Sequence, residues 1–183
     1  MLSYKDFKKE YLNEWVDRSQ AARKAAEEFA MKDTASLRDK YACIFDLAGH
    51  TVEFKGENEM NPNNPIHNFF TYEEAKNLFG KPDEYGWRLP TLNELKALKS
   101  NYLYKFDKEN KQGVFDNHLY LPAAGFRNCD GGVDDIGSDG CYWSSTPYGP
   151  DRVWYLYFFS NDVYISTYFR CCGFSVRLVR DVK

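Results

Sequence analysis

The chain has 183 residues, of which 43% are hydrophobic and 28% are charged, enough for one domain with a sizeable core and too few for two complete domains. A formal net charge of -3 at pH 7 gives no basic surface of the kind that nucleic-acid-binding proteins carry, so no nucleic-acid partner is expected. No apolar run approaches the roughly 20 residues that cross a bilayer, and the opening sequence MLSYKDFKKEYLNEW lacks the apolar core of a secretory signal. We therefore expect neither membrane insertion nor export by the general pathway.

The first segment, residues 3–31, is predicted to be a long helix. Ser3 with Asp6 resembles a capping box, and apolar side chains then recur at spacings of three, four and seven. The members of this stripe are Tyr4, Phe7, Tyr11, Trp15, Ala22 and Phe29. We expect residues 1–32 to form an N-terminal helix and residues 33–183 the main domain. We expect the helix to pack on its own domain. In the alternative interpretation it mediates homo-oligomerisation or docking to another protein, because heptad-like spacing also suits a short coiled coil.

Two shorter helices are predicted in the sequences YEEAKNLF and LNELKALKS. Each follows a Thr that has Glu three residues later, Thr71 with Glu74 and Thr91 with Glu94, which is the pattern of a capping box. The apolar side of the second helix is formed by Leu92, Leu95 and Leu98.

Strands are predicted mainly in the C-terminal third. From residue 118 onward the chain consists of short β-like runs separated by Gly, Asp, Asn and Pro: LYLPAAGFRN, GCYWSSTP, VWYLYFF, DVYIST and GFSVRLVRDV. Earlier, YACIFDLAGHTVEF predicts one or two strands around a turn at Gly49. Helices thus come first and an antiparallel meander last, which predicts an α+β fold with one antiparallel sheet.

Catalytic motifs are not recognisable in this sequence. There is no glycine-rich phosphate loop and no GxSxG nucleophile elbow. Ser144 and Ser145 have no His in a convincing relation to them, so we expect them to be structural. The three histidines are scattered, which gives no basis for a His-based metal site. We therefore expect no catalytic residues, no metal and no cofactor, and we do not expect an enzyme.

Five cysteines show neither CxxC nor any other metal-ligand spacing: Cys43, Cys129, Cys141, Cys171 and Cys172. An odd number, with two of them adjacent, makes a poor disulfide framework, so free thiols are expected. The alternative is a pair between Cys129 and Cys141, which flank a tight loop.

The loop CDGGVDDIGSDG contains four aspartates, whose oxygens are the ligand type that calcium prefers: Asp130, Asp134, Asp135 and Asp139. The loop lacks both EF-hand spacing and a closing bidentate Glu. A solvated, turn-rich loop is therefore expected, with calcium binding left open as the alternative.

Alternation along the C-terminal strands predicts two faces of different character. The apolar face is expected to form the core and comprises Trp154, Leu156, Phe158, Val163, Ile165, Phe174, Val176 and Leu178. The opposite face mixes aromatic and small polar residues and comprises Tyr155, Tyr157, Phe159, Asp162, Tyr164 and Ser166.

The choice of residues on this second face is restricted. Between Tyr155 and Cys172 there is no Lys, Glu, Gln or Met, although Lys and Glu are common elsewhere in the chain. The residues that do occur there can be encoded by codons ending in C or T, so they are reachable from an Asn codon by changing only its adenines. Randomised adenines in an Asn-rich template would produce this pattern.

Four blocks of the sequence, GWRLPTLNEL, LYLPAAGFRN, GCYWSSTP and GFSVRLVRDV, resemble motifs of the variable proteins of diversity-generating retroelements, in particular those of gut Bacteroides and their phages. The resemblance covers about residues 85–183 and implies a C-type-lectin-like fold with a variable region at about residues 141–180. In that family a reverse transcriptase copies adenine-directed errors from a template into the 3′ end of the gene.

The same resemblance implies which positions vary and bind ligand. The Asn positions of the template-like pattern fall on Tyr155, Tyr157, Phe159, Asp162, Tyr164, Ser166, Thr167, Tyr168, Phe169, Cys171 and Cys172, and further upstream on Tyr148, Asp151 and Arg152. The fixed positions fall on Leu156, Phe158, Val163, Ile165 and Arg170. Trp87, Pro90, Trp143 and Phe174 are expected to hold the scaffold.

The resemblance implies a ligand-binding, receptor-binding display protein whose partner is a protein or another cell-surface ligand. The residue types agree, because Tyr and Phe supply large, rigid contact area while Ser, Thr and Asp adapt by hydrogen bonding. In the alternative, these aromatics fill a second core or are covered by the N-terminal helix. The alternative functions are a non-diversified surface or adhesin domain of the same fold, or a relative of the formylglycine-generating oxidases. The missing signal favours a phage particle or non-classical surface display.

Overall fold

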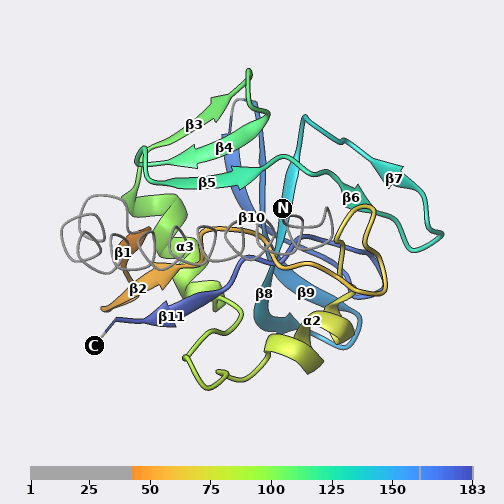
Figure 1. The fold of residues 1–183 in the computed structure, drawn as a ribbon, viewed down its shortest axis with the longest axis horizontal. Coiled ribbons are helices and arrows are strands. Elements are labelled where there is room, and N and C mark those ends of the chain that lie inside the picture. Colours follow the sequence, from red (N-terminus) through yellow and green to blue (C-terminus); the bar gives the residue numbers. More distant parts are fainter. Residues whose placement is uncertain (1–42, 161, 183) are drawn as a thin grey trace, which may run out of the picture. The chain divides into compact units, whose positions relative to one another are not determined.

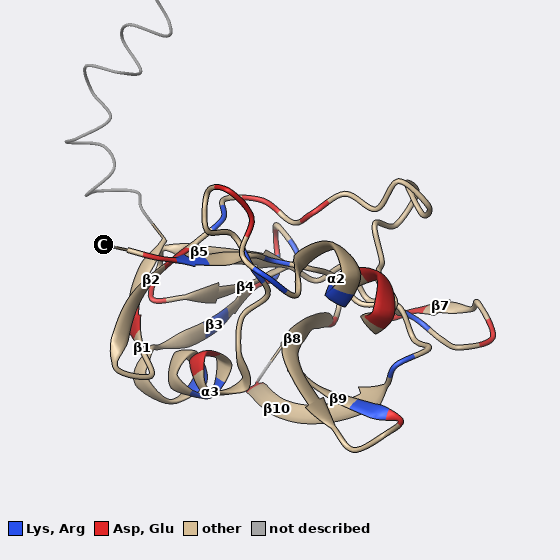
Figure 2. Cartoon of the chain, turned by 90° about the horizontal axis from the view of Figure 1, so that it is seen from below, with Lys and Arg blue, Asp and Glu red and all other residues tan. Residues whose placement is uncertain are grey.

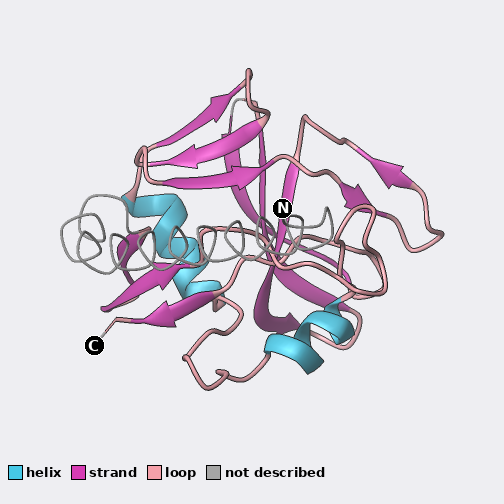
Figure 3. Ribbon diagram, viewed as in Figure 1, coloured by secondary structure: helices cyan, strands magenta, loops and turns pink. Residues whose placement is uncertain are grey.

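The structure, a computed structural model, describes residues 43–160 and 162–182 (Figure 1). This part of the chain is mostly β, with several small antiparallel sheets and only two helices, of eight and ten residues (Figure 3). The prediction of an α+β fold with a single sheet is therefore wrong, because additional strands form where none was predicted. The predicted helix at residues 3–31 and the domain boundary after residue 32 lie outside the described residues.

Both predicted short helices are present, as α2 (Tyr72–Phe79) and α3 (Leu92–Asn101). Each begins after a Thr whose hydroxyl accepts a hydrogen bond from the N–H of the Glu three residues later, while that Glu carboxylate accepts from the Thr N–H. This exchange satisfies N–H groups that have no partner within the helix. Leu95 and Leu98 of α3 are buried, and Leu92 is half-buried. Neither described helix has the length and apolar character that a membrane crossing requires.

The first sheet has the order β1-β2-β11 and joins β1 (Ile44–Leu47), β2 (His50–Phe54) and β11 (Val179–Asp181). The predicted hairpin is confirmed. Its two turn residues, Ala48 and Gly49, have φ values of 54° and 89°, the positive angles that a tight two-residue hairpin turn requires. The pairing of β11 with β2 brings the last described residues beside the first ones.

The last predicted strand, GFSVRLVRDV, is a regular strand only in β11. Residues 173–178 form isolated bridges, including Phe70 with Phe174 and Arg127 with Gly173. Every residue from 173 to 178 is buried, so this segment passes through the interior instead of lying at the edge of a sheet. Its carbonyl groups bond to loops, for example that of Val176 to the N–H of Glu59.

The second sheet has the order β10-β9-β8 and contains the longest described strands, β8 (Gly140–Tyr148), β9 (Arg152–Phe159) and β10 (Asp162–Phe169). All three are antiparallel neighbours, as predicted. The β8–β9 register shifts between Trp143 and Pro147, which marks a bulge.

Ser144 lies in this bulge and is buried. Its hydroxyl donates to the carbonyl of Trp154 at 2.8 Å and accepts from the N–H of Thr146 at 3.1 Å. The hydroxyl thus satisfies backbone groups that the interrupted ladder leaves unpaired, which confirms the structural role expected for this serine.

The remaining sheets were largely missed from the sequence. β3 (Tyr104–Asp107), β4 (Gln112–Phe115) and β5 (Leu119–Pro122) form a three-stranded sheet, and β6 (Phe126–Arg127) pairs with β7 (Val133–Asp134). The sequences of β3, β4 and β7 are short and flanked by Lys, Asp, Asn and Gly, so neither length nor alternation distinguished them from loops.

The core lies on both faces of the β8–β9–β10 sheet. On one face, a cluster that includes Leu95 and Leu98 of α3 contains the sheet residues Tyr142, Leu156, Phe158 and Val163. On the other face, a second cluster contains the sheet residues Cys141, Trp143, Val153 and Tyr155. Phe174, Val176 and Leu178 belong to this second cluster, so the prediction that they continue the face of Leu156 and Phe158 is wrong. Because residues 173–178 form isolated bridges and do not continue the β9–β10 ladder, alternation counted along the chain did not carry over to them.

The predicted scaffold residues lie around this second cluster. The Trp143 ring stacks on Phe174 at a centroid distance of 4.1 Å, and its indole N–H donates to the carbonyl of Phe70 at 2.8 Å. Pro90 is buried, and the guanidinium of Arg180 lies 4.6 Å from the centroid of the half-buried Trp87 ring. These contacts agree with a role in holding the scaffold.

Candidate functional site

The β9–β10 register places half of the predicted ligand-binding residues on one face. Tyr157 is opposite Tyr164, and directly opposed residues of an antiparallel pair project to the same side. The seven predicted residues on this side are Tyr155, Tyr157, Phe159, Asp162, Tyr164, Ser166 and Tyr168. We call this surface the aromatic face.

Exposure changes along the aromatic face. Tyr155 is only 7% exposed and belongs to the second core cluster. Tyr157, Phe159 and Tyr168 are half-buried, whereas Tyr164 is 41% exposed. The alternative in which these aromatics form a second core therefore holds for Tyr155 but not for the residues farther along the strands.

Other predicted binding residues lie on the opposite side of the two strands. The guanidinium of Arg152 lies 4.4 Å from the ring centroid of Phe169 on the neighbouring strand. Tyr148, at the end of β8, is exposed and packs edge-on against Trp154. Thr167 is half-buried between these residues and the core, and Asp151 lies in the exposed β8–β9 turn.

The residues at the predicted fixed positions are buried in the core or held by hydrogen bonds. Leu156, Phe158 and Val163 are buried in the first core cluster, and Ile165 packs against it. Arg170 follows β10 and donates to the Glu73 carboxylate at 2.9 Å. Its guanidinium also lies over the Tyr72 ring. These residues secure the strands on which the predicted variable positions lie.

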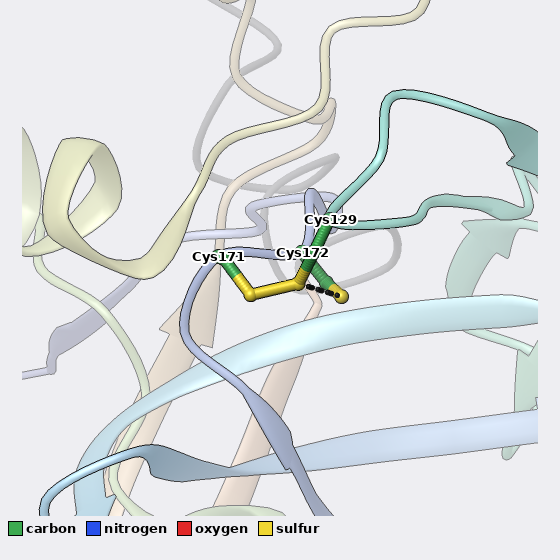
Figure 4. Close-up of side chains that lie close together, drawn as sticks. All are labelled: Cys129, Cys171 and Cys172. Carbon is green, nitrogen blue, oxygen red and sulfur yellow. Dashed lines mark hydrogen bonds between the residues drawn. A yellow bond between two sulfur atoms is a disulfide. The ribbon is translucent and has the colours of Figure 1, made fainter.

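The cysteines differ from the expectation of free thiols. Cys129 and Cys171 form a disulfide with a Cα–Cα distance of 5.1 Å (Figure 4). The alternative pair between Cys129 and Cys141 is also wrong, because Cys141 is a buried free thiol of the second core cluster. The Cys172 thiol is buried as well, and its sulfur lies 3.0 Å from that of Cys129. No local spacing revealed this pair, since its members are 42 residues apart.

Cys171 and Cys172 were predicted as ligand-binding residues, and the structure places them beside the aromatic face. The disulfide ties the segment after β10 to the loop that connects β6 and β7. Burial raises the pKa of the Cys172 thiol, which lowers the fraction of reactive thiolate.

The four aspartates of residues 129–140 do not form a shared metal site among the described residues. Asp130 accepts from the Gly132 N–H at 3.0 Å, and Asp134 accepts from the side-chain amide of Asn128. Two other groups are close enough to share an ion: the three cysteines of Figure 4, and His50 with Glu94 and Asp181.

Both carboxylates of the second group are paired with one guanidinium. Arg88 donates to both Glu94 and Asp181 at 2.7 Å, and His50 lies 2.8 Å from the buried Glu94 carboxylate. Burial alone would raise the pKa of Glu94, but hydrogen bonds from Arg88, Thr91 and His50 bring it down to about 2. The arrangement joins α3 to β2 and β11.

Two cavities open on the aromatic face, and Tyr157 lines both. The larger has a volume of about 430 Å³ and is lined by Phe106, Lys108, Lys111, Gly137, Ser138, Asp139, Tyr157, Phe159 and Ser160. The smaller has a volume of about 270 Å³ and is lined by Phe126, Asp135, Cys141, Tyr155, Tyr157, Tyr168 and Phe174.

Tyr157 separates these cavities in a defined position. Its hydroxyl donates to the Asp139 carboxylate at 2.5 Å. Burial, this hydrogen bond and the Asp139 charge raise the pKa of the phenol, so it stays protonated at neutral pH. The ring is thereby fixed as a wall between a cavity with two lysines and a cavity with aromatic sides.

Several lining residues were not predicted to bind ligand. Phe106, Lys108 and Lys111 come from the β3–β4 hairpin, and Phe126 comes from β6. They lie outside the C-terminal strands, and only the folding of separate sheets brings them to the aromatic face. The Asp-rich segment was noticed in the sequence as a candidate calcium site. Its position at the rim of a cavity was not predicted.

Comparison with known families agrees with the resemblance noted above. The family model for the Lcl C-terminal domain matches residues 48–180, which is more than half of the chain. No curated protein and no solved structure matched. Membership indicates a ligand-binding, adhesin-like domain. The chain belongs to the Lcl C-terminal domain family, a family of the C-type-lectin-like fold that is found in variable proteins of diversity-generating retroelements.

Proposed function

We propose that this chain is a receptor-binding display protein whose aromatic face contacts a protein or another cell-surface ligand. The observation that carries the proposal is the pair of cavities on this face that share Tyr157, whose ring stacks beside the exposed Tyr164. Rigid aromatic side chains with adjacent hydroxyls and carboxylates are typical of surfaces that bind diverse partners.

We further propose that the face is diversified by adenine-directed mutagenesis. The support is the restricted set of residues between Tyr155 and Cys172, every one of which has a codon ending in C or T. The pattern also separates buried fixed positions such as Leu156 and Phe158 from positions on the aromatic face.

The genomic neighbourhood tests diversification. We expect a near-copy of the 3′ end of the gene beside a reverse-transcriptase gene, with differences at adenines only. If the neighbourhood contains no such copy, the second candidate function applies, a non-diversified adhesin domain of the same fold.

Binding is tested with labelled protein on a panel of intact gut Bacteroides cells, measured by flow cytometry. The combined variant Phe159→Ala and Tyr164→Ala should lose cell binding, because both side chains lie on the aromatic face. Tyr120→Ala, which removes an exposed tyrosine of β5, is the matched control and should retain it. Equal binding by both variants would contradict a role for the aromatic face.

The oxidase alternative has little support from the cysteines. Such chemistry needs reactive thiols, but Cys171 is in a disulfide and Cys172 is buried with a raised pKa. A turnover that the double variant Cys171→Ser and Cys172→Ser abolished would favour the oxidase.

A further inference from the structure

The smaller cavity on the aromatic face is a preformed box of aromatic rings. Its floor consists of Tyr155, Phe174 and Cys141, which are 7%, 1% and 3% exposed. The half-buried rings of Tyr168 and Phe126 form one side, and Tyr157 forms the wall toward the larger cavity.

These rings hold one another in place. The Tyr155 and Phe174 centroids are 4.8 Å apart, and Tyr168 lies 5.5 Å from Phe174. Phe126 packs edge-on against Tyr168 at 5.8 Å. A ligand entering the box therefore meets rings already in position and does not have to order them, which lowers the entropic cost of binding.

The rim of the box is acidic. Asp135 lines the cavity, Asp134 precedes it at the end of β7, and Asp139 follows it just before β8; Figure 2 shows acidic residues near β7. Burial and repulsion from Asp139 and Asp134 raise the pKa of Asp135. Within the described residues, none of these three carboxylates has an ion-pair partner, and no Lys, Arg or His lines the smaller cavity.

Basic residues of neighbouring segments do not line the box. Arg127 follows Phe126 in β6 and lies against Gly173, outside the cavity lining. Burial raises the pKa of Tyr168, and the Arg152 charge opposes this effect to a smaller extent. The Arg152 guanidinium nevertheless lies over Phe169 and donates to the carbonyl of Thr167, on the opposite side of the strands. Lys108 and Lys111 line the larger cavity beyond Tyr157. Within the described residues, Asp135 therefore has no ion-pair partner of its own at the rim of the box.

We propose that the smaller cavity binds an organic cation, a quaternary or alkylated ammonium group carried by the ligand, between the aromatic rings and the Asp135 carboxylate. The faces of aromatic rings attract cations through the ring quadrupole, and aromatic cages of this kind suit quaternary ammonium groups. This inference rests on the proposed function, because it names the chemical class that the aromatic face recognises.

Other occupants fit the cavity less well. An inorganic cation needs several oxygen ligands, whereas Asp135 supplies the one carboxylate in the lining. A neutral apolar group would cover the Asp135 rim without compensating its charge, which costs free energy. An alkylated ammonium interacts favourably with both the aromatic rings and the carboxylate, since its methyl groups contact the rings and its charge faces Asp135.

Choline and its uncharged isostere 3,3-dimethylbutan-1-ol test the proposal, because they have the same shape and differ in charge. We expect choline to shift the NMR signals of the Tyr155, Tyr168 and Phe174 rings in the full-length protein, and the isostere to bind at least tenfold more weakly. Equal binding of the two would show an apolar cavity and would overturn the proposal, as would the absence of a shift with either at concentrations up to tens of millimolar.

Variants connect the binding to named side chains. Asp135→Asn should weaken choline binding by about tenfold, the factor that about 1.4 kcal/mol produces, because it removes the charge and keeps the shape. Asp130→Asn, in the nearby β6–β7 turn but outside the cavity lining, is the matched control and should bind normally. Tyr168→Phe should retain binding and Tyr168→Leu should lose it. Thermal melting of each variant checks that the fold is kept, and equal affinities for Asp135→Asn and Asp130→Asn would overturn the proposal.

Two further probes identify the carrier of the cation. Phosphocholine and Nε-trimethyl-lysine present the same group on a headgroup and on a side chain, and binding of either above its uncharged analogue supports the proposal. Failure of the proposed function is seen separately in the cell-binding experiment. If cells bind through the aromatic face but none of these cations binds, the cation inference fails while the proposed function stands.

Discussion

At the scale of single residues, two buried charged side chains join segments of the scaffold that are distant in the sequence. Glu94 is fully buried and accepts hydrogen bonds from Arg88, Thr91 and, through the imidazole, His50. Arg177 is 4% exposed and has no carboxylate partner among the described residues. Such groups are stable inside a protein only when their hydrogen-bonding capacity is met.

The low pKa of Glu94 makes it a source of pH-dependent stability. The folded value of about 2 lies below the usual 4.5, so its contribution is present above about pH 4.5 and is lost as the pH falls toward 2. The difference in free energy of unfolding between wild type and Glu94→Gln should therefore shrink by up to about 3 kcal/mol over this interval. Denaturant unfolding at several pH values measures it. A difference that stayed constant from pH 6 to pH 2.5 would contradict the assignment.

Arg177 donates to four acceptors, which are the Asn58 side chain and the carbonyls of Lys55, Gly56 and Tyr120. Arg177→Lys should lower the free energy of unfolding by about 2–4 kcal/mol, because an ammonium cannot reach all four acceptors from one position. Arg180→Lys is the control. Its side chain is partly exposed, donates hydrogen bonds to Glu53 alone and lies over the Trp87 ring, so the loss should be smaller, at about 1 kcal/mol. Similar losses of unfolding free energy for both variants would show that the hydrogen bonds from Arg177 to the carbonyls do not cause the destabilisation.

At the scale of elements, the β6–β7 hairpin is a small unit held by few backbone bonds. Two residue pairs, Phe126 with Asp134 and Arg127 with Val133, form its ladder. The Cys129–Cys171 disulfide joins the loop of this hairpin to the segment after β10. Because the hairpin supplies Phe126 and leads into the Asp135 rim of the smaller cavity, the disulfide supports one side of the candidate site.

Reduction of this disulfide should destabilise the protein. Closing a loop of this length stabilises the folded state by about 2–4 kcal/mol, so a reductant should lower the melting temperature of the wild type. The double variant Cys129→Ser and Cys171→Ser should melt at the lower temperature with or without reductant. An unchanged melting temperature of the reduced wild type, with thiol titration confirming reduction, would contradict the prediction.

At the scale of the whole molecule, the central sheet is both scaffold and binding surface. Residues that share the aromatic face range from buried to exposed along β9 and β10. Positions near the second core cluster contribute to stability, whereas positions near the β9–β10 turn are available to a partner. Diversification of the face would therefore affect stability at one end and recognition at the other.

Paired alanine variants test this division. Tyr155→Ala should lower the free energy of unfolding by about 3 kcal/mol, because it removes a buried ring that packs against Trp143 and Phe174. Tyr164→Ala should cost less than about 1 kcal/mol, since the ring is 41% exposed. Chemical denaturation measures both. A cost for Tyr164→Ala that equals the cost for Tyr155→Ala would show that the whole face is structural.

The features that were predictable from the sequence are those with local causes. The capping boxes at Thr71 and Thr91 need only four consecutive residues, and the alternation in β9 and β10 needs only one strand each. The Cys129–Cys171 pair, the β3–β4 hairpin and the passage of residues 173–178 through the interior depend on contacts between distant segments. For the same reason the sequence located the aromatic face but not Phe126, Lys111 or the carboxylate of Asp135 around its cavities.

The position of Tyr157 makes the two cavities thermodynamically linked. One ring forms a wall of both, and its hydroxyl is bonded to Asp139, which lines the larger cavity. A group that displaces the ring toward one side enlarges one cavity at the expense of the other, so filling either changes the free energy of filling its neighbour. This coupling is reciprocal and has the same magnitude in whichever order the cavities fill. A ligand that spans both cavities would therefore have a binding free energy that differs from the sum of the free energies measured for its two halves.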